Sequence, residues 1–283
     1  MEKAIILLSC PDKEGIVSAI SGFISQHQGN IEHADQHIDA QNGILFMRIE
    51  WSLERFTLPK TEISSAFRPL AEQFHMNWSL HFFQDTPRVA IFVSRNLHCL
   101  YDLLLRFRDG QLKCEIPLVI SNHKEAEKAA GHFSVEFRHF FVSSDNKESI
   151  EKEQLELLRQ HDIDLVVLAR YMQILTPQMV NAFSRRIINI HHSFLPAFIG
   201  KDPYGQAHKK GVKIIGATSH YVTEALDNGP IIEQDTVRIS HRDSREDLIR
   251  KGQDLEKMVL SRAVQWHLER KILVYNHKTV VFD

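Results

Sequence analysis

The chain has 283 residues, of which 43% are hydrophobic and 25% are charged, and this balance excludes an intrinsically disordered polymer. Its 34 Lys and Arg residues against 36 Asp and Glu leave a net charge of -2, which argues against nucleic acid or an anionic membrane as the main partner. A small, neutral or modestly anionic ligand is easier to accommodate, and the length favours two domains over one.

The cysteine content and the N-terminus indicate the compartment. Cys10, Cys99 and Cys114 are scattered and have no CxxC spacing, so they predict neither a disulfide framework nor a thiolate metal site. The first apolar run, AIILL, is too short for a secretory signal, and no other segment approaches the length of a membrane span. We therefore expect a soluble, cytoplasmic protein with reduced, largely buried cysteines.

The first third of the chain has the pattern of one α+β domain. Apolar residues recur at helical spacing between Ile16 and Ile24, and strand-like runs lie on either side. The expected order is βαββαβ, with strands at 3–9, 30–39, 44–51 and 76–82 and helices at 16–29 and 61–74.

A turn around Pro87 separates this unit from a different pattern, so we expect domains at 1–84 and 85–283. Short apolar strands then alternate with amphipathic helices, which predicts a doubly wound, mostly parallel α/β sheet covered on both faces. Opposite charges spaced i,i+4 in the helix at 146–162 indicate a solvated face. Ligands of such sheets lie beyond the carboxyl ends of the strands.

The segment NIHHSFLP, residues 189–196, places polar side chains at such an end. Because side chains alternate along a strand, Asn189 and His191 are expected on one side and His192 on the other. A metal clamp made of both adjacent histidines would need this alternation to break down.

A second polar segment follows at 216–235. It predicts a strand ending near Val222, a loop that carries Asp227, and a new strand opened by Gly229 and Pro230. His220 precedes Asp227 by seven residues. An aspartate in this loop can reach the end of the neighbouring strand that carries Asn189.

An amide, an imidazole and a carboxylate on one pocket suit acyl chemistry, because they can stabilise an oxyanion, move a proton and position water. The chain has no GxSxG elbow, which favours direct attack by water or by a second substrate. A zinc or iron site made of His191, His220 and Asp227 is the alternative, but no HExxH-type spacing supports it, so we expect no metal. A purely structural role is the competing interpretation for His192 and, more strongly, for His220.

The two motifs, NIHHSFLPAFIG and GVKIIGATSHYVTEALDNGPIIEQD, resemble those of the folate-dependent formyltransferase family, and the resemblance extends over the whole chain. The N-terminal unit, with its DKEGIV turn, is similar to an ACT domain. The resemblance implies an ACT-like regulatory or oligomerisation domain at 1–84 and a formyltransferase-fold catalytic domain at 85–283. It implies Asn189, His191 and Asp227 as the catalytic residues.

Within this family the chain looks like the members that hydrolyse 10-formyltetrahydrofolate rather than the transferases. The transferases that act on a phosphorylated amine carry a glycine-rich phosphate loop, whereas this chain has no glycine between Val93 and Leu104. The resemblance therefore implies release of formate and tetrahydrofolate, formate supply for purine biosynthesis, balancing of the one-carbon folate pool, and no separate cofactor. A formyltransferase with an unidentified amine acceptor and a non-catalytic folate- or amino-acid-binding regulator remain as alternatives.

The same resemblance places the folate against the segment LARYMQIL, residues 168–175. The expected substrate-binding residues are Tyr171, Met172, Ile174, Leu175, His192 and His220. An ordinary core role is the alternative for each of the four in the segment. The turn from Asp12 to Gly15 is the expected site of an amino-acid effector in a homo-oligomer, with pure oligomerisation as the alternative. Gln173, Lys201 and Asp202 receive no role from the sequence.

Overall fold

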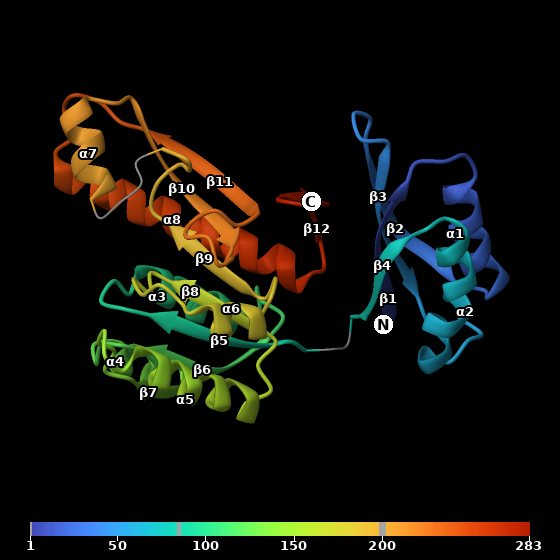
Figure 1. Ribbon diagram of the computed structural model, residues 1–283, viewed down its shortest axis with the longest axis horizontal. Helices are drawn as coiled ribbons and strands as arrows, with labels where there is room; N and C mark the ends of the chain where they lie inside the picture. Colours follow the sequence, from blue (N-terminus) through green and yellow to red (C-terminus); the bar gives the residue numbers. More distant parts are fainter. Residues whose placement is uncertain (1, 84–85, 198–201) are drawn as a thin grey trace. The chain divides into compact units, whose positions relative to one another are not determined.

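The computed structural model describes residues 2–83, 86–197 and 202–283. The chain divides into two compact units, Met1–Thr86 with Arg270–Asp283, and Pro87–Glu269 (Figure 1). The expected division between 84 and 85 falls on residues outside the described ranges. The sequence assigned the C-terminal residues to the second domain, but the structure groups Arg270–Asp283 with the first unit.

The first unit follows the expected βαββαβ order. Its elements are β1 (Lys3–Pro11), α1 (Ile16–Gln26), β2 (Asn30–Asp39), β3 (Ile44–Ser52), α2 (Lys60–Gln73) and β4 (Asn77–Phe82). Within residues 2–83 these strands form an antiparallel sheet in the order β2-β3-β1-β4. One sheet face packs against the two helices around the fully buried residues Ile20, Trp51 and Phe67.

The C-terminal hairpin joins this unit at an apolar patch on the opposite face of the sheet. The hairpin consists of β12 (Ile272–Tyr275) and β13 (Lys278–Val281). Phe282 is buried together with Leu7 of β1 and Phe46 of β3, and the rings of Phe46 and Tyr275 meet edge-on at 5.1 Å. Side chains alternate along β3, so Phe46 faces the hairpin while its neighbours face the helices.

The second unit is a doubly wound α/β domain, as predicted. Within the described part of Pro87–Glu269, seven strands pair in the order β11-β10-β9-β8-β5-β6-β7 (Figure 1). Strands β5 to β9 are parallel, and β10 runs antiparallel to both of its neighbours. The strands are β5 (Arg88–Val93), β6 (Glu115–Ser121), β7 (Glu136–His139), β8 (Leu165–Ala169), β9 (Ile187–His191), β10 (Ile214–Tyr221) and β11 (Ile231–Arg238).

Helices cover this sheet and bury its apolar strands. They are α3 (His98–Arg108), α4 (Ala126–His132), α5 (Lys147–Gln160), α6 (Pro177–Ala182), α7 (Pro203–Lys210) and α8 (Arg245–Leu268). Leu155 and Leu158 of α5 pack with Phe92 of β5 and Leu168 of β8 in one continuous core. Helix α8 packs along β9, β10 and β11.

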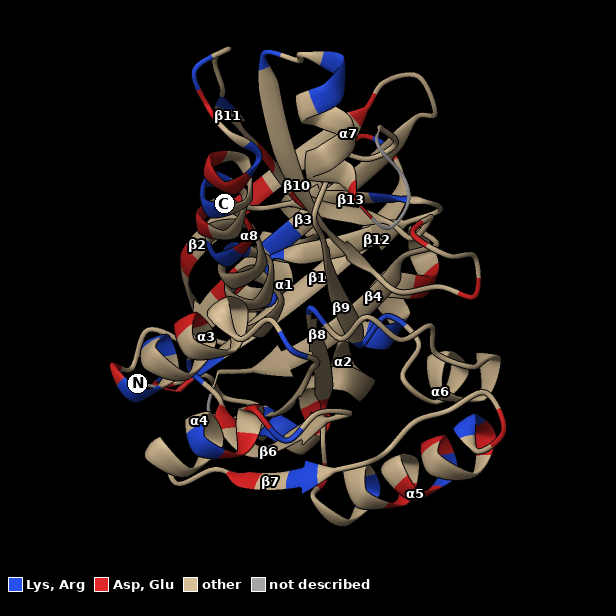
Figure 2. Cartoon of the chain, turned by 90° about the vertical axis from the view of Figure 1, so that its left-hand side faces the viewer, with Lys and Arg blue, Asp and Glu red and all other residues tan. Residues whose placement is uncertain are grey.

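The charged helix α5 has the solvated face that the sequence predicted and a second face that is buried. Figure 2 shows acidic and basic residues mixed along it. Glu151 and Gln154, however, are buried together with Leu155 and Leu158. These four positions follow i, i+3, i+4, i+7 spacing and therefore share one helical face, which points into the protein.

Cys10, Cys99 and Cys114 are buried and free, and the predicted burial is confirmed. None of the helices in the described ranges is long and apolar enough to cross a membrane.

Candidate active site

Asn189 and His220 face each other where β9 meets β10. The two residues are register partners, and Asn189 Nδ2 lies 3.2 Å from His220 Nε2. His220 Nδ1 lies 2.9 Å from the carbonyl oxygen of Tyr221. Because a carbonyl only accepts, Nδ1 carries the hydrogen, and in the neutral ring Nε2 accepts from the Asn189 amide. His220 thereby fixes which way the Asn189 amide points.

His191 and Asp227 form the second pair of the site. His191 Nδ1 lies 3.2 Å from Asp227 Oδ2, and Asp227 Oδ1 is 3.7 Å from His220 Nε2. The hydrogen bond to His191, together with nearby His220, holds the pKa of Asp227 well below its usual range. His191 Nε2 is buried and has no hydrogen-bond partner among the described residues. That nitrogen is therefore the atom of the pair whose hydrogen-bonding capacity is unused.

The Asp-x-Gly-Pro spacing has a direct structural reason. Asp227 has φ of 52°, a conformation that aspartate and asparagine tolerate better than most residues. The chain then passes so close to β10 that a Cβ at Gly229 would overlap the carbonyl oxygen of Tyr221. Tyr221 N donates to Pro230 O at 2.9 Å and closes the loop. Glycine at 229 thus lets the loop return to β10 with Asp227 against His191.

A buried threonine holds the loop that follows His192. Thr218 Oγ1 donates to the Ser193 carbonyl oxygen at 2.9 Å and accepts from Leu195 N at 3.0 Å and from Gln234 Nε2 at 2.9 Å. Thr218 is fully buried on β10. These bonds fix the backbone directly after β9.

The sequence predicted that His191 and His192 lie on opposite sides of the strand, and this prediction is wrong. Strand β9 ends at His191, so the strand alternation stops there, and the two imidazole rings lie 5.3 Å apart with both lining one pocket. Burial, followed by the charge of Arg170, lowers the pKa of His192 to about 4. His192 is therefore neutral near pH 7.

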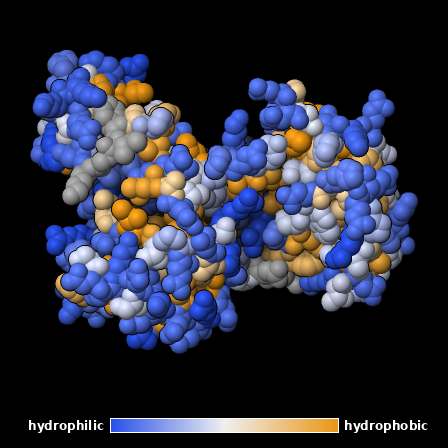
Figure 3. All heavy atoms as spheres, viewed as in Figure 1, coloured by the Kyte–Doolittle hydropathy of each residue, from blue (hydrophilic) through white to orange (hydrophobic). Residues whose placement is uncertain are grey.

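The pocket beside these residues has a volume of 370 Å³ and a largely apolar wall. Figure 3 shows apolar surface around β8 and β9. All six expected substrate-binding residues line this pocket: Tyr171, Met172, Ile174, Leu175, His192 and His220. The side chains of Met172 and Ile174 are exposed, whereas Tyr171 packs edge-on against Phe92 and belongs to both wall and core.

Sequence reasoning missed the residues that hold this wall in place. Glu151 accepts hydrogen bonds from the backbone N–H and the hydroxyl of Thr176, at the end of the pocket loop. Gln154 Nε2 donates to the Tyr171 hydroxyl at 3.3 Å. The signal was present in the sequence, because both residues share the helical spacing of Leu155 and Leu158. The charge pattern of this helix did not reveal its buried face.

The residues without an expected role fall in different places. Gln173 lines the pocket, and Lys201 lies outside the described residues. Asp202 caps α7 by accepting from Gly205 N at 3.0 Å, and it pairs with Arg245 at 3.2 Å. Asp12 and Gly15 belong to the first unit, where Gly15 has φ of 88° and begins α1.

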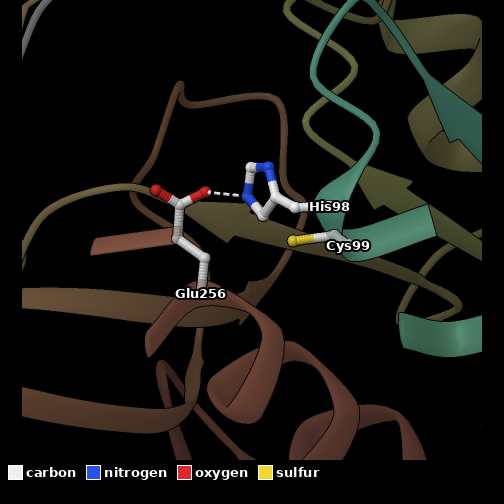
Figure 4. Close-up of side chains that lie close together, drawn as sticks. All are labelled: His98, Cys99 and Glu256. Atoms are coloured by element: carbon white, nitrogen blue, oxygen red, sulfur yellow. Dashed lines mark hydrogen bonds and ion pairs between the residues drawn. The ribbon is translucent and has the colours of Figure 1, made fainter. Parts of the chain in front are cut away.

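A second polar cluster lies at His98, Cys99 and Glu256, whose candidate ligand atoms are all within 4.8 Å of one another (Figure 4). Both carboxylate oxygens of Glu256 already accept, one from Tyr204 at 2.6 Å and one from His98 at 2.8 Å. Arg170 lies 3.5 Å from the same carboxylate, and burial keeps the pKa of the Cys99 thiol well above its usual range. The contacts of Glu256 therefore suit a carboxylate that balances the charge of Arg170 better than they suit a metal ligand.

The chain is similar to known proteins over its whole length. Residues 87–264 match the family model described as formyl transferase. The chain belongs to the formyl transferase family. It is 55% identical over 279 residues to a protein named formyltetrahydrofolate deformylase from Synechocystis sp., covering 99% of this chain and 98% of that one. A protein of the same name from Bacillus subtilis is 50% identical over 283 residues, and the match covers 100% of this chain and 94% of that one.

A solved structure of a formyltetrahydrofolate deformylase from Pseudomonas syringae is similar over the whole chain as well. It superposes with a TM-score of 0.97 at 46% sequence identity, and the match covers 100% of this chain and 95% of that one. The similarity therefore includes both compact units.

Proposed function

We propose that this chain hydrolyses 10-formyltetrahydrofolate to formate and tetrahydrofolate. The observation that carries the proposal is the His191 imidazole, whose Nδ1 faces Asp227 and whose buried Nε2 has no hydrogen-bond partner among the described residues. The full-length similarity to proteins named formyltetrahydrofolate deformylase supports this substrate.

In the proposed mechanism, Asn189 and His191 act on the formyl oxygen. The Asn189 amide, oriented by His220, and the protonated Nε2 of His191 donate hydrogen bonds to this oxygen as negative charge develops on it. Asp227 stabilises the imidazolium by accepting from Nδ1. The attacking group is water, which adds to the formyl carbon.

The hydrogen bonds from His191 and His220 lower the pKa of Asp227, so this carboxylate is a weaker base than an ordinary aspartate. A carboxylate with so low a pKa is too weak a base to deprotonate free water. The oxygen of the water becomes positively charged as its bond to carbon forms, and its proton is then acidic enough for transfer to Asp227. A proton passed on to N10 allows the C–N bond to break, which gives the amine and formate.

The pocket supports the placement of the folate. Exposed Met172 and Ile174, with Tyr171 and Leu175 behind them, offer an apolar surface to the pterin ring. Glu151 and Gln154 keep this loop in one conformation. His192 is neutral and buried beside His191, where it shapes the site without adding charge.

The test is a stopped assay of the purified full-length chain with 10-formyltetrahydrofolate, a chelator and no amine acceptor. We expect formate and tetrahydrofolate in equimolar amounts, at a rate that added amines do not change. Turnover only when an amine is supplied would identify a transferase instead, and binding without turnover would identify a regulator.

The wider role also belongs to this proposal: formate supply for purine biosynthesis, a cytoplasmic location and a reaction without a separate cofactor. We propose in addition that the first unit is an ACT-like module for assembly or amino-acid control. Its element order and the exposed Asp12–Gly15 turn support this assignment. Light scattering and thermal shifts across a panel of amino acids, with Gly15→Ala as the control for the turn, test it.

A further inference from the structure

Arg170 has a backbone conformation that is unfavourable for arginine and that glycine adopts more readily. It directly follows β8 and has φ of 64°, in the left-handed region where glycine is preferred. Its carbonyl oxygen accepts from Ser94 N at 3.2 Å, at the end of neighbouring β5. Only 9% of the residue is exposed, so a charged side chain is buried on a disfavoured backbone. Non-glycine residues in this conformation are enriched at active sites and ligand-binding sites.

Arg170 has unused hydrogen-bonding capacity on its guanidinium, and the residue lines the pocket described above. Arg170 lines this pocket together with Asn189 and His191. Its Nε and Nη1 are buried and have no hydrogen-bond partner in the described part of the chain. Buried N–H groups without an acceptor are unfavourable, above all on a charged group. The arrangement therefore indicates that a ligand supplies the acceptor.

Glu256 provides the counter-charge without using these donors. Arg170 Nη1 lies 3.5 Å from Glu256 Oε2, close enough for an ion pair but too far for a good hydrogen bond. The carboxylate is held by Tyr204 on one oxygen and by His98 on the other, the bond drawn as a dashed line in Figure 4. Burial raises the pKa of Glu256, but the hydrogen bonds and the charge of Arg170 outweigh it, so the carboxylate stays ionised.

We propose that Arg170 binds the formate ion released in the proposed hydrolysis, through its free N–H groups. The inference rests on that proposed function. Hydrolysis breaks the formyl C–N bond, forms a C–O bond with water, returns one proton to N10 and leaves formate with one released proton. A carboxylate therefore forms inside the pocket that Arg170 lines, and a planar guanidinium is suited to carboxylates. The carboxylates of the folate are at the far, glutamate end of that molecule, away from the reacting carbon.

The experiment compares product inhibition by formate with substrate binding. Arg170→Gly fits the backbone and removes the guanidinium, and Arg170→Lys keeps the charge but not the planar fork. Arg170→Gly combined with Glu256→Gln avoids a buried unpaired carboxylate, and Arg238→Met removes an exposed arginine of the same unit as a matched control. The readouts are the formate inhibition constant and the KM for 10-formyltetrahydrofolate, with sodium chloride at equal ionic strength.

Arg170→Gly and the double variant each lose one charge-assisted contact to formate. We expect the formate inhibition constant to rise at least about tenfold in both, which corresponds to about 1.4 kcal/mol. The KM for 10-formyltetrahydrofolate should change less than about threefold. Arg170→Lys should fall between, and Arg238→Met should match the parent chain. An unchanged inhibition constant overturns the proposal, and so does a rise in KM alone, which would place a folate carboxylate on Arg170. Equimolar formate release by the parent chain separates this failure from failure of the hydrolysis itself.

Discussion

The substitution Asp227→Asn tests the proposed division of labour most directly. Asparagine has nearly the same shape and also tolerates the φ of 52° at this position, so the loop should keep its conformation. The change removes the negative charge 3.2 Å from His191 Nδ1. Asp227 would then neither stabilise the imidazolium nor accept a proton from the attacking water.

The structure sets the size of the effect. Two unit charges at the 3.2 Å between Asp227 and His191 interact by about 5 kcal/mol at an effective dielectric constant of about 20. The side chain of Asp227 is only 18% exposed, so solvent screens little of this energy. An equivalent loss of transition-state stabilisation lowers kcat by about 10³- to 10⁴-fold.

The assay quantifies formate and tetrahydrofolate under initial-rate conditions and measures folate binding separately. We expect kcat to fall by this amount while the folate dissociation constant changes less than about threefold, because Asp227 acts on the transition state. Glu224→Gln is the matched control, since Glu224 lies in the same loop, lines the same pocket and pairs with Asn181. Equal losses in kcat and binding, or a fall in kcat below about tenfold, would refute the catalytic role and leave Asp227 as a residue that shapes the pocket.

Three further outcomes concern stability, and urea unfolding measures each of them. Between pH 6.5 and about 4 the unfolded chain binds a proton on His192 that the folded chain does not, so acidification through this window should lower the free energy of unfolding by about 3 kcal/mol more in the parent chain than in His192→Gln. The similar contribution of His81 is common to both proteins, and equal pH slopes would contradict the lowered pKa of His192. Gly252→Ala should lower the free energy of unfolding by about 1–3 kcal/mol, since its Cβ would overlap the Tyr204 hydroxyl; a neutral effect would show that the ring moves freely. Phe282→Ala should cost about 3–5 kcal/mol by emptying the core under the C-terminal hairpin, whereas a cost below about 1 kcal/mol would mean that the hairpin adds little to the first unit.

The local pattern of the sequence was enough to predict the two kinds of fold. The apolar residues from Ile16 to Ile24 recur at helical spacing and predicted the first helix, because only one face of that helix is buried. The continuous apolar run LVVLA predicted β8, because both faces of that strand are buried. The motifs around Asn189 and Asp227 also pointed to one pocket, and the structure brings them together because β10 runs antiparallel to β9, which sets His220 opposite Asn189 and the loop of Asp227 beside them.

Other features depended on contacts between distant segments. The sequence could not assign the hairpin of Phe282 to the first unit, because its partners Leu7 and Phe46 lie more than 200 residues earlier. Strand alternation failed at His192 because β9 ends at His191, and the loop that follows is held by hydrogen bonds to Thr218 of β10.

By itself the sequence determined which residue types, at which spacings, could perform acyl chemistry. Only the tertiary structure decided which of their atoms are available. Asp227 occupies Nδ1 of His191 and leaves Nε2 to the pocket, and His220 turns the Asn189 amide. Arg170 and Glu256, 86 positions apart in the numbering, become an ion pair only when α8 packs against the sheet. Hydrogen-bond direction and charge pairing depend on distances of a few ångströms, which the order of residues does not encode locally.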